Sequence, residues 1–185
     1  MIDLPDKAAL VVIDVQKGFD EPYWGARNNP GAEANIARLL GAWRRAGRPV
    51  FHVKHNSRSP KSPLHVTNPG NAFKDVAAPT AGEPSFHKEV NSAFIGTGLE
   101  ARLREADVSE LVIVGLTTPH CVSTSARMAA NLGFRTIVVS DATAAHAGRG
   151  PDGKVVDAET MHYHALAALN GEFADISTTG QLLDA

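Results

Sequence analysis

Short apolar runs alternate with amphipathic segments along the chain, and this pattern restricts it to few folds. The runs 8–13 and 111–114 have no polar face, which is typical of strands in a sheet that is covered on both sides. Between such runs lie segments with apolar residues at helical spacing, as in 30–46. Alternating strands and helices predict a Rossmann-like, three-layer α/β/α fold with a central, mostly parallel six-stranded sheet.

The same patterns give the approximate bounds of each element. The predicted strands are 8–14, 49–54, 85–88, 111–114, 134–140 and about 174–177. The predicted helices are 30–46, 97–106 (with a capping box at Thr97 and Glu100), 122–132, 157–170 and a short terminal one. Two long loops remain, at 55–84 and 147–153. Because no linker or repeat interrupts this order, we expect one domain over residues 1–185.

Composition excludes several classes of partner. A formal net charge of −2 gives no basic surface for nucleic acid or an anionic membrane. No apolar run approaches the roughly 18 residues that a membrane span needs. The first residues, Met-Ile-Asp-Leu-Pro-Asp-Lys, lack the basic and apolar regions of a secretion signal. A single cysteine allows no internal disulfide and fits a reducing compartment, so we expect a cytoplasmic location.

That cysteine, Cys121, stands in the run Gly-Leu-Thr-Thr-Pro-His-Cys-Val at 115–122. A lone cysteine in a strand or helix is usually a small buried apolar residue. Here it lies where a buried strand passes into a helix, at the edge where open α/β sheets bind ligands. Unpaired N–H groups and the helix dipole favour a thiolate at such a place. Cys121 is therefore a candidate nucleophile.

Two further polar residues follow strands directly. Asp14 comes after the run 8–13, and Lys88 ends the predicted strand 85–88. The carboxyl ends of parallel strands share one edge of the sheet, so we expect Asp14, Lys88 and Cys121 to meet in one pocket. A carboxylate beside an ammonium supplies the base and the cation that a reactive thiol needs.

These residues carry a family resemblance. Asp-Val-Gln-Lys-Gly-Phe at 14–19, His-Lys-Glu-Val-Asn-Ser-Ala-Phe at 87–94 and the block at 115–122 resemble the three signatures of the isochorismatase-like cysteine hydrolases, relatives of nicotinamidases and N-carbamoylsarcosine amidohydrolases. The first block alone is weakly specific for this family, but the three blocks together, in this order and at this spacing, are strongly specific for it. The resemblance covers roughly residues 7–180.

The resemblance implies a catalytic triad of Asp14, Lys88 and Cys121. Asp14 would take the thiol proton, Lys88 would stabilise the thiolate, and Cys121 would attack a carbonyl carbon to give a thioester. The substrate would be a small amide, carbamoyl or ureido compound. Backbone N–H groups of Thr117 and Cys121 would bind the oxyanion, and the peptide bond between Leu116 and Thr117 would be cis.

Side chains near the triad could form the substrate pocket. Phe19, Tyr23 and Trp24 follow the first strand and could form an apolar wall against a planar substrate. Asn91 follows Lys88, and His120 precedes the nucleophile. The candidate substrate-binding residues are Phe19, Trp24, Asn91 and His120.

We predict no metal and no cofactor. Nicotinamidases hold a divalent metal through an Asp-x-His pair after the second strand, but this chain has His52, Lys54 and His55 there, without an acidic residue. His52 and Lys54 share one strand face and His55 lies on the other, which is poor ligand geometry.

Other histidines have weaker signals. His162 and His164 are two residues apart on a predicted helix, so they do not share a face, and we expect them at the surface or at a subunit contact. His65 lies in the long loop, and its role stays open. Because family members often assemble, we expect a homo-oligomer.

Three alternatives stay open at this point. The protein could be a metal-assisted amidase of the nicotinamidase type, or a catalytically silent or regulatory member that binds a small molecule. A Rossmann-like nucleotide-binding protein is a third class, but neither G-x-G-x-x-G nor G-x-x-x-x-G-K-[ST] follows a predicted strand.

Overall fold

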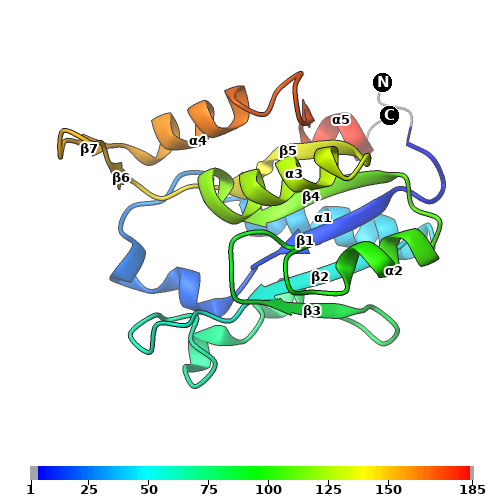
Figure 1. The fold of residues 1–185 in the computed structure, drawn as a ribbon, viewed down its shortest axis with the longest axis horizontal. Coiled ribbons are helices and arrows are strands. Elements are labelled where there is room, and N and C mark those ends of the chain that lie inside the picture. Colours follow the sequence, from blue (N-terminus) through cyan, green and yellow to red (C-terminus); the bar gives the residue numbers. More distant parts are fainter. Residues whose placement is uncertain (1–3, 184–185) are drawn as a thin grey trace.

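The computed structural model describes residues 4–183 and contains one central sheet of six parallel strands (Figure 1). Their order is β3-β2-β1-β4-β5-β8, and each neighbouring pair is parallel. The prediction of a mostly parallel six-stranded sheet is confirmed. The strands are β1 (Ala9–Ile13), β2 (Val50–His55), β3 (Ser85–Lys88), β4 (Glu110–Leu116), β5 (Arg135–Ala144) and β8 (Asp175–Ser177).

Helices cover both faces of the sheet, as the buried central strands β1 and β4 require. Figure 1 shows α2 and α3 in front of the sheet and α1 behind it. Four short 3-10 helices and one π-helical turn, labelled η, lie in the connecting segments of the described chain. The helices are α1 (Ala32–Arg45), α2 (Leu99–Glu105), α3 (Ser123–Asn131), α4 (Ala158–Ala167) and α5 (Thr179–Leu183). The turns are η1 (Lys17–Asp20), η2 (Pro22–Trp24), η3 (Pro69–Asn71), η4 (Asp75–Ala77) and the π-helical η5 (Thr118–Val122).

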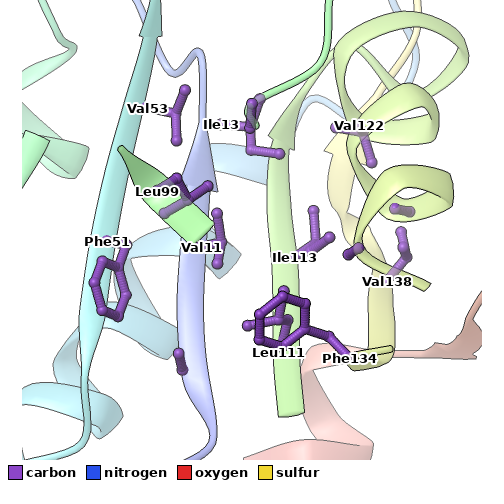
Figure 2. Close-up of a cluster of buried hydrophobic side chains, with 14 of the residues drawn as sticks. Val11, Ile13, Phe51, Val53, Leu99, Leu111, Ile113, Val122, Phe134 and Val138 are labelled. Carbon is purple, nitrogen blue, oxygen red and sulfur yellow. The ribbon is translucent and has the colours of Figure 1, made fainter. Parts of the chain in front are cut away.

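Alternation along each strand divides the core into two clusters. Val11 and Ile13 of β1 pack with Leu99 of α2 and Val122 before α3 (Figure 2). Leu10 and Val12 point to the other face and pack against the helix α1, on its residues Ile36, Leu39, Leu40 and Trp43. β1 thus buries apolar side chains on both of its faces, which explains why it has no polar side.

Two predicted element boundaries differ from the structure. The strand predicted to end at 140 continues to Ala144, because Thr143 and Ala144 pair again with β4 beyond a register shift. Asn29 Nδ2 donates to the carbonyl oxygens of Ser140 and Thr143 at this irregularity. The predicted loop 147–153 forms part of a hairpin, β6 (Gly148–Arg149) with β7 (Val155–Val156).

The predicted capping box does not form. Helix α2 begins at Leu99 with Gly98 as its N-cap. The Thr97 hydroxyl donates to the carbonyl of Ala93 and accepts only a long bond, 3.4 Å, from the Leu99 N–H, while Glu100 pairs with Arg104. A local sequence pattern gave way here to a contact with the preceding turn.

The long segment 55–84 is held to the sheet by Gln16. This buried side chain donates to the carbonyl oxygens of His55 and Asn71 and accepts from the His55 N–H at 2.8 Å. Asn71 donates in turn to the carbonyl oxygens of His55 and Leu64. The loop is thus fixed where β2 ends, next to the carboxyl edge of the sheet.

Among residues 4–183, no helix is long and apolar enough to cross a membrane. The chain order along the sheet reverses between β1 and β4, since β2 and β3 lie on one side and β5 and β8 on the other. Open α/β sheets bind ligands at the carboxyl ends of the strands at such a switch point.

Gly115 allows β4 to approach β1 at this point. Its φ is +119°, and a Cβ there would lie 1.9 Å from the carbonyl oxygen of Ile13. We predict that Gly115→Ala lowers the free energy of unfolding by ~3 kcal/mol or more, because overpacking and a positive φ each cost about 1–3 kcal/mol. Urea unfolding measures this loss.

Gly31→Ala is the matched control, since Gly31 has open space around its Cα and no positive φ. We expect it to cost about 1 kcal/mol or less, because Ala is a poorer N-cap than Gly but meets no atom there. Equal stability of the two variants would contradict the close approach at Gly115.

Candidate active site

Four neighbouring strands each place one polar side chain at the carboxyl edge of the sheet. Lys88 ends β3, His55 ends β2, Asp14 follows β1, and Cys121 lies in η5 after β4. The structure therefore brings together the three residues predicted to meet, and adds His55. Parallel strands make this possible because all their carboxyl ends lie at one edge.

The Lys88 ammonium is the centre of this group. Its Nζ lies 2.6 Å from Asp14 Oδ2, 2.9 Å from His55 Nδ1 and 3.2 Å from Cys121 Sγ. The side chains of Lys88 and Asp14 are both fully buried. A buried ion pair of this kind is held by its mutual contacts, since neither charge has water to solvate it.

Asp14 has one oxygen free to accept a proton. Oδ2 is bound to Lys88, whereas Oδ1 is buried and has no hydrogen-bond partner in the 4–183 range. Burial raises the pKa of this carboxyl, against the lowering effect of the Lys88 charge and of the neighbouring Cys121 thiol. A carboxylate with a raised pKa is a stronger base.

The Cys121 sulfur is buried but lines a cavity. Burial raises the pKa of its thiol above the usual range, the charge of Asp14 adds to this, and Lys88 opposes it only in part. Burial and the Asp14 carboxylate thus oppose the thiolate that the helix start was predicted to favour, and Lys88 supports it.

The turn that carries Cys121 has an unusual backbone. The peptide bond between Leu116 and Thr117 is cis, as the resemblance implies. Thr117 and Cys121 both line the cavity, so their N–H groups stay candidates for an oxyanion site. The carbonyl oxygen of Thr117 accepts from the N–H groups of His120 and Val122, which fixes the turn.

A cavity of about 500 Å³ opens over the sulfur. The four candidate substrate-binding residues all line it: Phe19, Trp24, Asn91 and His120. Its other lining residues are Tyr23, His55, Ser57, Ser62, Leu64, Thr117, His146, Ala147, Gly148, Arg149 and Met161. A larger hollow of about 670 Å³ lies beside Arg48, Pro84 and Glu105 and includes no residue of the predicted triad.

An aromatic wall, made of Phe19, Trp24 and His146, bounds one side of the cavity. The rings of Phe19 and Trp24 lie 5.0 Å apart, and His146 stacks on Phe19 at 6.1 Å. Trp24 Nε1 donates to the carbonyl of Gly18, which orients the indole. Burial and the charge of Arg27 lower the pKa of His146 to about 4, so its imidazole is neutral near pH 7. Sequence patterns missed His146 because it follows β5 in an irregular segment.

An ion-pair network supports the segment that carries this wall. Glu33 of α1 accepts from Arg27 at 2.5 Å and from Lys74 at 2.7 Å, and Lys74 also contacts Asp20. Burial favours a higher pKa for Glu33, but the hydrogen bonds from Arg27 and Lys74 outweigh it and lower the pKa to about 2. The network ties η1 and the 68–77 segment to α1.

The remaining histidines behave differently from one another. His52 is a buried histidine of β2: its Nε2 contacts Glu83 Oε2 at 2.8 Å, whereas its buried Nδ1 has no hydrogen-bond partner among residues 4–183. His65 pairs with Thr67 and does not line the cavity. His164 is exposed.

The prediction of a surface position for His162 is wrong. The side chain is buried, and its Nδ1 lies 2.8 Å from Oγ1 of Thr118 in η5, the turn that carries Cys121. Helix α4 packs against η5, which buries the face of the helix that carries His162. The spacing of residues along the helix alone could not indicate which face is buried.

One group of side chains in the described chain has ligand atoms near enough for a metal ion. Atoms of Asp14, His55 and Cys121 lie within 4.8 Å of one another. Lys88 Nζ contacts each of the three residues, so its ammonium already occupies the position between them that a metal ion would need. These residues therefore do not fit a metal while Lys88 is present.

Comparison with known proteins agrees with this geometry. Residues 8–181 match the Isochorismatase domain family. The chain belongs to the isochorismatase family. It is 48% identical over 181 residues to the isochorismatase family protein YrdC of Bacillus subtilis, which covers 98% of this chain and 97% of that protein.

A solved structure and a named amidohydrolase are also similar. The crystal structure of a putative hydrolase of the isochorismatase family from Chromobacterium violaceum superimposes with a TM-score of 0.95 at 40% identity, covering 100% of this chain and 96% of that one. Maleamate amidohydrolase of Pseudomonas putida is 35% identical over 153 residues, 73% of this chain and 71% of that enzyme.

We predict that Glu33→Gln lowers the free energy of unfolding near neutral pH. The pKa of Glu33 is about 2 in the folded chain against 4.5 ordinarily, so its contribution is complete above about pH 4.5 and is lost toward pH 2. The difference between wild type and variant should narrow as pH falls through this range in urea unfolding. Glu89→Gln, which breaks an exposed pair with Arg58, should change little at any pH.

We predict that Lys88→Met slows alkylation of Cys121 by iodoacetamide near pH 8 by ~10-fold or more, the equivalent of one unit of thiol pKa. The ammonium opposes the rise in the thiol pKa, and methionine removes it while keeping a similar volume. Lys54→Met is the control, since Lys54 lies over the ring of Phe73 and away from the sulfur. Wild-type alkylation in Lys88→Met would contradict this role for the charge.

Proposed function

We propose that the protein is a cysteine-dependent hydrolase that cleaves a C–N bond in a small amide, carbamoyl or ureido compound. The contact of Lys88 Nζ with both Asp14 Oδ2 and Cys121 Sγ carries this proposal, because it joins base, cation and nucleophile. Family membership and the similarity to maleamate amidohydrolase support a hydrolase acting on C–N bonds.

The first step forms a thioester. The substrate carbonyl lies beside Sγ, and Asp14 takes the thiol proton as the sulfur attacks the carbonyl carbon. Lys88 keeps its proton and stabilises the negative charge on sulfur as it develops. The N–H groups of Thr117 and Cys121 stabilise the oxyanion of the tetrahedral intermediate. When the C–N bond breaks, Asp14 returns the proton to the leaving amine.

The second step releases the acid. Water enters in place of the amine, and Asp14 removes one of its protons as the oxygen attacks the thioester. The C–S bond breaks, and the proton on Asp14 returns to the sulfur. The sum is an amide plus water giving an acid plus an amine, with the site restored.

The raised pKa values of Asp14 and Cys121 suit this sequence. Burial raises both pKa values, which favours keeping a proton on the pair over releasing it to solvent. Transfer between them leaves the net charge of the buried site unchanged, because Lys88 stays positive throughout. A proton moved within a closed group of this kind costs less than one exchanged with water.

The cavity supports a small, partly planar substrate. Its volume of about 500 Å³ is within the range of small-molecule sites, and the rings of Phe19 and Trp24 offer a flat apolar surface. Asn91 and His120 add polar groups near the sulfur. We propose these four residues as the substrate contacts.

The raised pKa of the Cys121 thiol favours a second candidate, a silent or regulatory member that binds a small molecule without turning it over. Such a protein would keep the cavity and would not depend on its sulfur. The experiment below separates the two.

We predict that Cys121→Ala abolishes ammonia release from a panel of small amides that includes maleamate and nicotinamide. Loss of a nucleophile lowers the rate by roughly 10³-fold or more. The fold should persist, since the change removes one atom from a cavity wall. Ammonia is measured by a coupled assay, and thermal unfolding checks the fold.

Ser123→Ala is the control, because Ser123 lies in the same helix start and does not line the cavity. Undiminished turnover in Cys121→Ala would refute a cysteine mechanism. Binding of a panel amide by the wild type, with no ammonia released from any compound, would favour the silent alternative.

A further inference from the structure

We propose that His55 is a positioning residue of this site: its Nδ1 takes the third N–H of the Lys88 ammonium and so holds the charge between carboxylate and sulfur. The effect on hydrolysis rests on the proposed function, whereas the effect on the sulfur does not.

The argument begins with the donors of Lys88. An ammonium has three N–H groups and no acceptor, and it is fully satisfied only by three separate acceptors. The three atoms around Nζ are Asp14 Oδ2 at 2.6 Å, His55 Nδ1 at 2.9 Å and Cys121 Sγ at 3.2 Å. Without His55, one N–H of a fully buried ammonium would lose its partner and the group would shift toward another acceptor.

The same contact fixes the tautomer of His55. Because Lys88 can only donate, Nδ1 must accept, and the proton of the neutral imidazole lies on Nε2. Burial and the neighbouring Lys88 charge lower the pKa of His55 to about 4, so the ring is neutral near pH 7. A neutral ring adds no second positive charge beside the ammonium.

The other ring nitrogen is available to a ligand. His55 lines the cavity, and its Nε2 has no hydrogen-bond partner in the described part of the chain. Nε2–H is therefore a donor for an acceptor oxygen of the substrate. One imidazole thus holds the catalytic cation with one nitrogen and faces the substrate cavity with the other.

The backbone of His55 is held in place for this role. Its N–H donates to Gln16 Oε1 at 2.8 Å, and its carbonyl oxygen accepts from Gln16 Nε2 at 3.0 Å and from Asn71 Nδ2 at 3.1 Å. These bonds join β2 to the residue two positions after Asp14. The glutamine of the first signature block therefore fixes the distance between His55 and the ion pair.

Two amide variants separate the nitrogens of the ring. Asn carries its amide at the distance of Nδ1 from the backbone, and Gln carries it at the distance of Nε2. His55→Asn can keep an acceptor for Lys88, whereas His55→Gln keeps a donor to the cavity and loses that acceptor. His55→Phe removes both.

We expect iodoacetamide to alkylate Cys121 in His55→Asn at the wild-type rate. In His55→Gln and His55→Phe we expect a rate lower by ~10-fold, the equivalent of one unit of thiol pKa. This assay needs no substrate, and unfolding midpoints identify any variant that does not fold. The Asn and Gln pair decides the question even if His55→Phe is unfolded.

Wild-type alkylation in folded His55→Gln would overturn the proposal, and so would an equal loss in His55→Asn and His55→Gln. A second measurement uses the panel amide that the wild type hydrolyses fastest. There we expect His55→Asn to keep kcat and to raise KM, because it lacks the Nε2–H donor. If the wild type hydrolyses no amide, the proposed function fails, while the alkylation rates still decide the role of His55.

Discussion

The ion pair between Lys88 and Asp14 is the interaction on which the site depends. Both side chains are fully buried, so each charge is stabilised only by the other and by the polar atoms around them. The strand order β3-β2-β1-β4 brings these atoms together from segments that are far apart in the chain. The two apolar layers above and below the sheet exclude water from the pair and keep its members in contact.

The sequence was sufficient for the sheet and for the three residues predicted to meet at its edge. Strands such as β1 are apolar on both faces, and Asp14 and Lys88 are polar residues at strand ends, so their shared edge follows from parallel pairing. The end of β5 depends on renewed pairing with β4 beyond a register shift, where Asn29, more than a hundred residues earlier, donates to two β5 carbonyl oxygens. No local pattern carries such a contact.

The missed site residues share the same cause. His146 and Arg149 lie in an irregular stretch and in a two-residue hairpin strand, where periodicity gives no signal. His55 does have a signal, because alternation in β2 sets it on the face opposite His52. The contact of His55 with Lys88 depends on the position of β2 between β1 and β3, which alternation within β2 does not indicate.

The hairpin β6–β7 lines the cavity with Gly148 and Arg149, although it pairs with no strand of the central sheet. The polar cluster at the sheet edge and this part of the cavity wall therefore belong to separate pieces of backbone. Insertions or exchanges in the hairpin can reshape this wall without moving the sulfur or the ammonium. Relatives with the same reactive centre can in this way diverge in the compounds they admit.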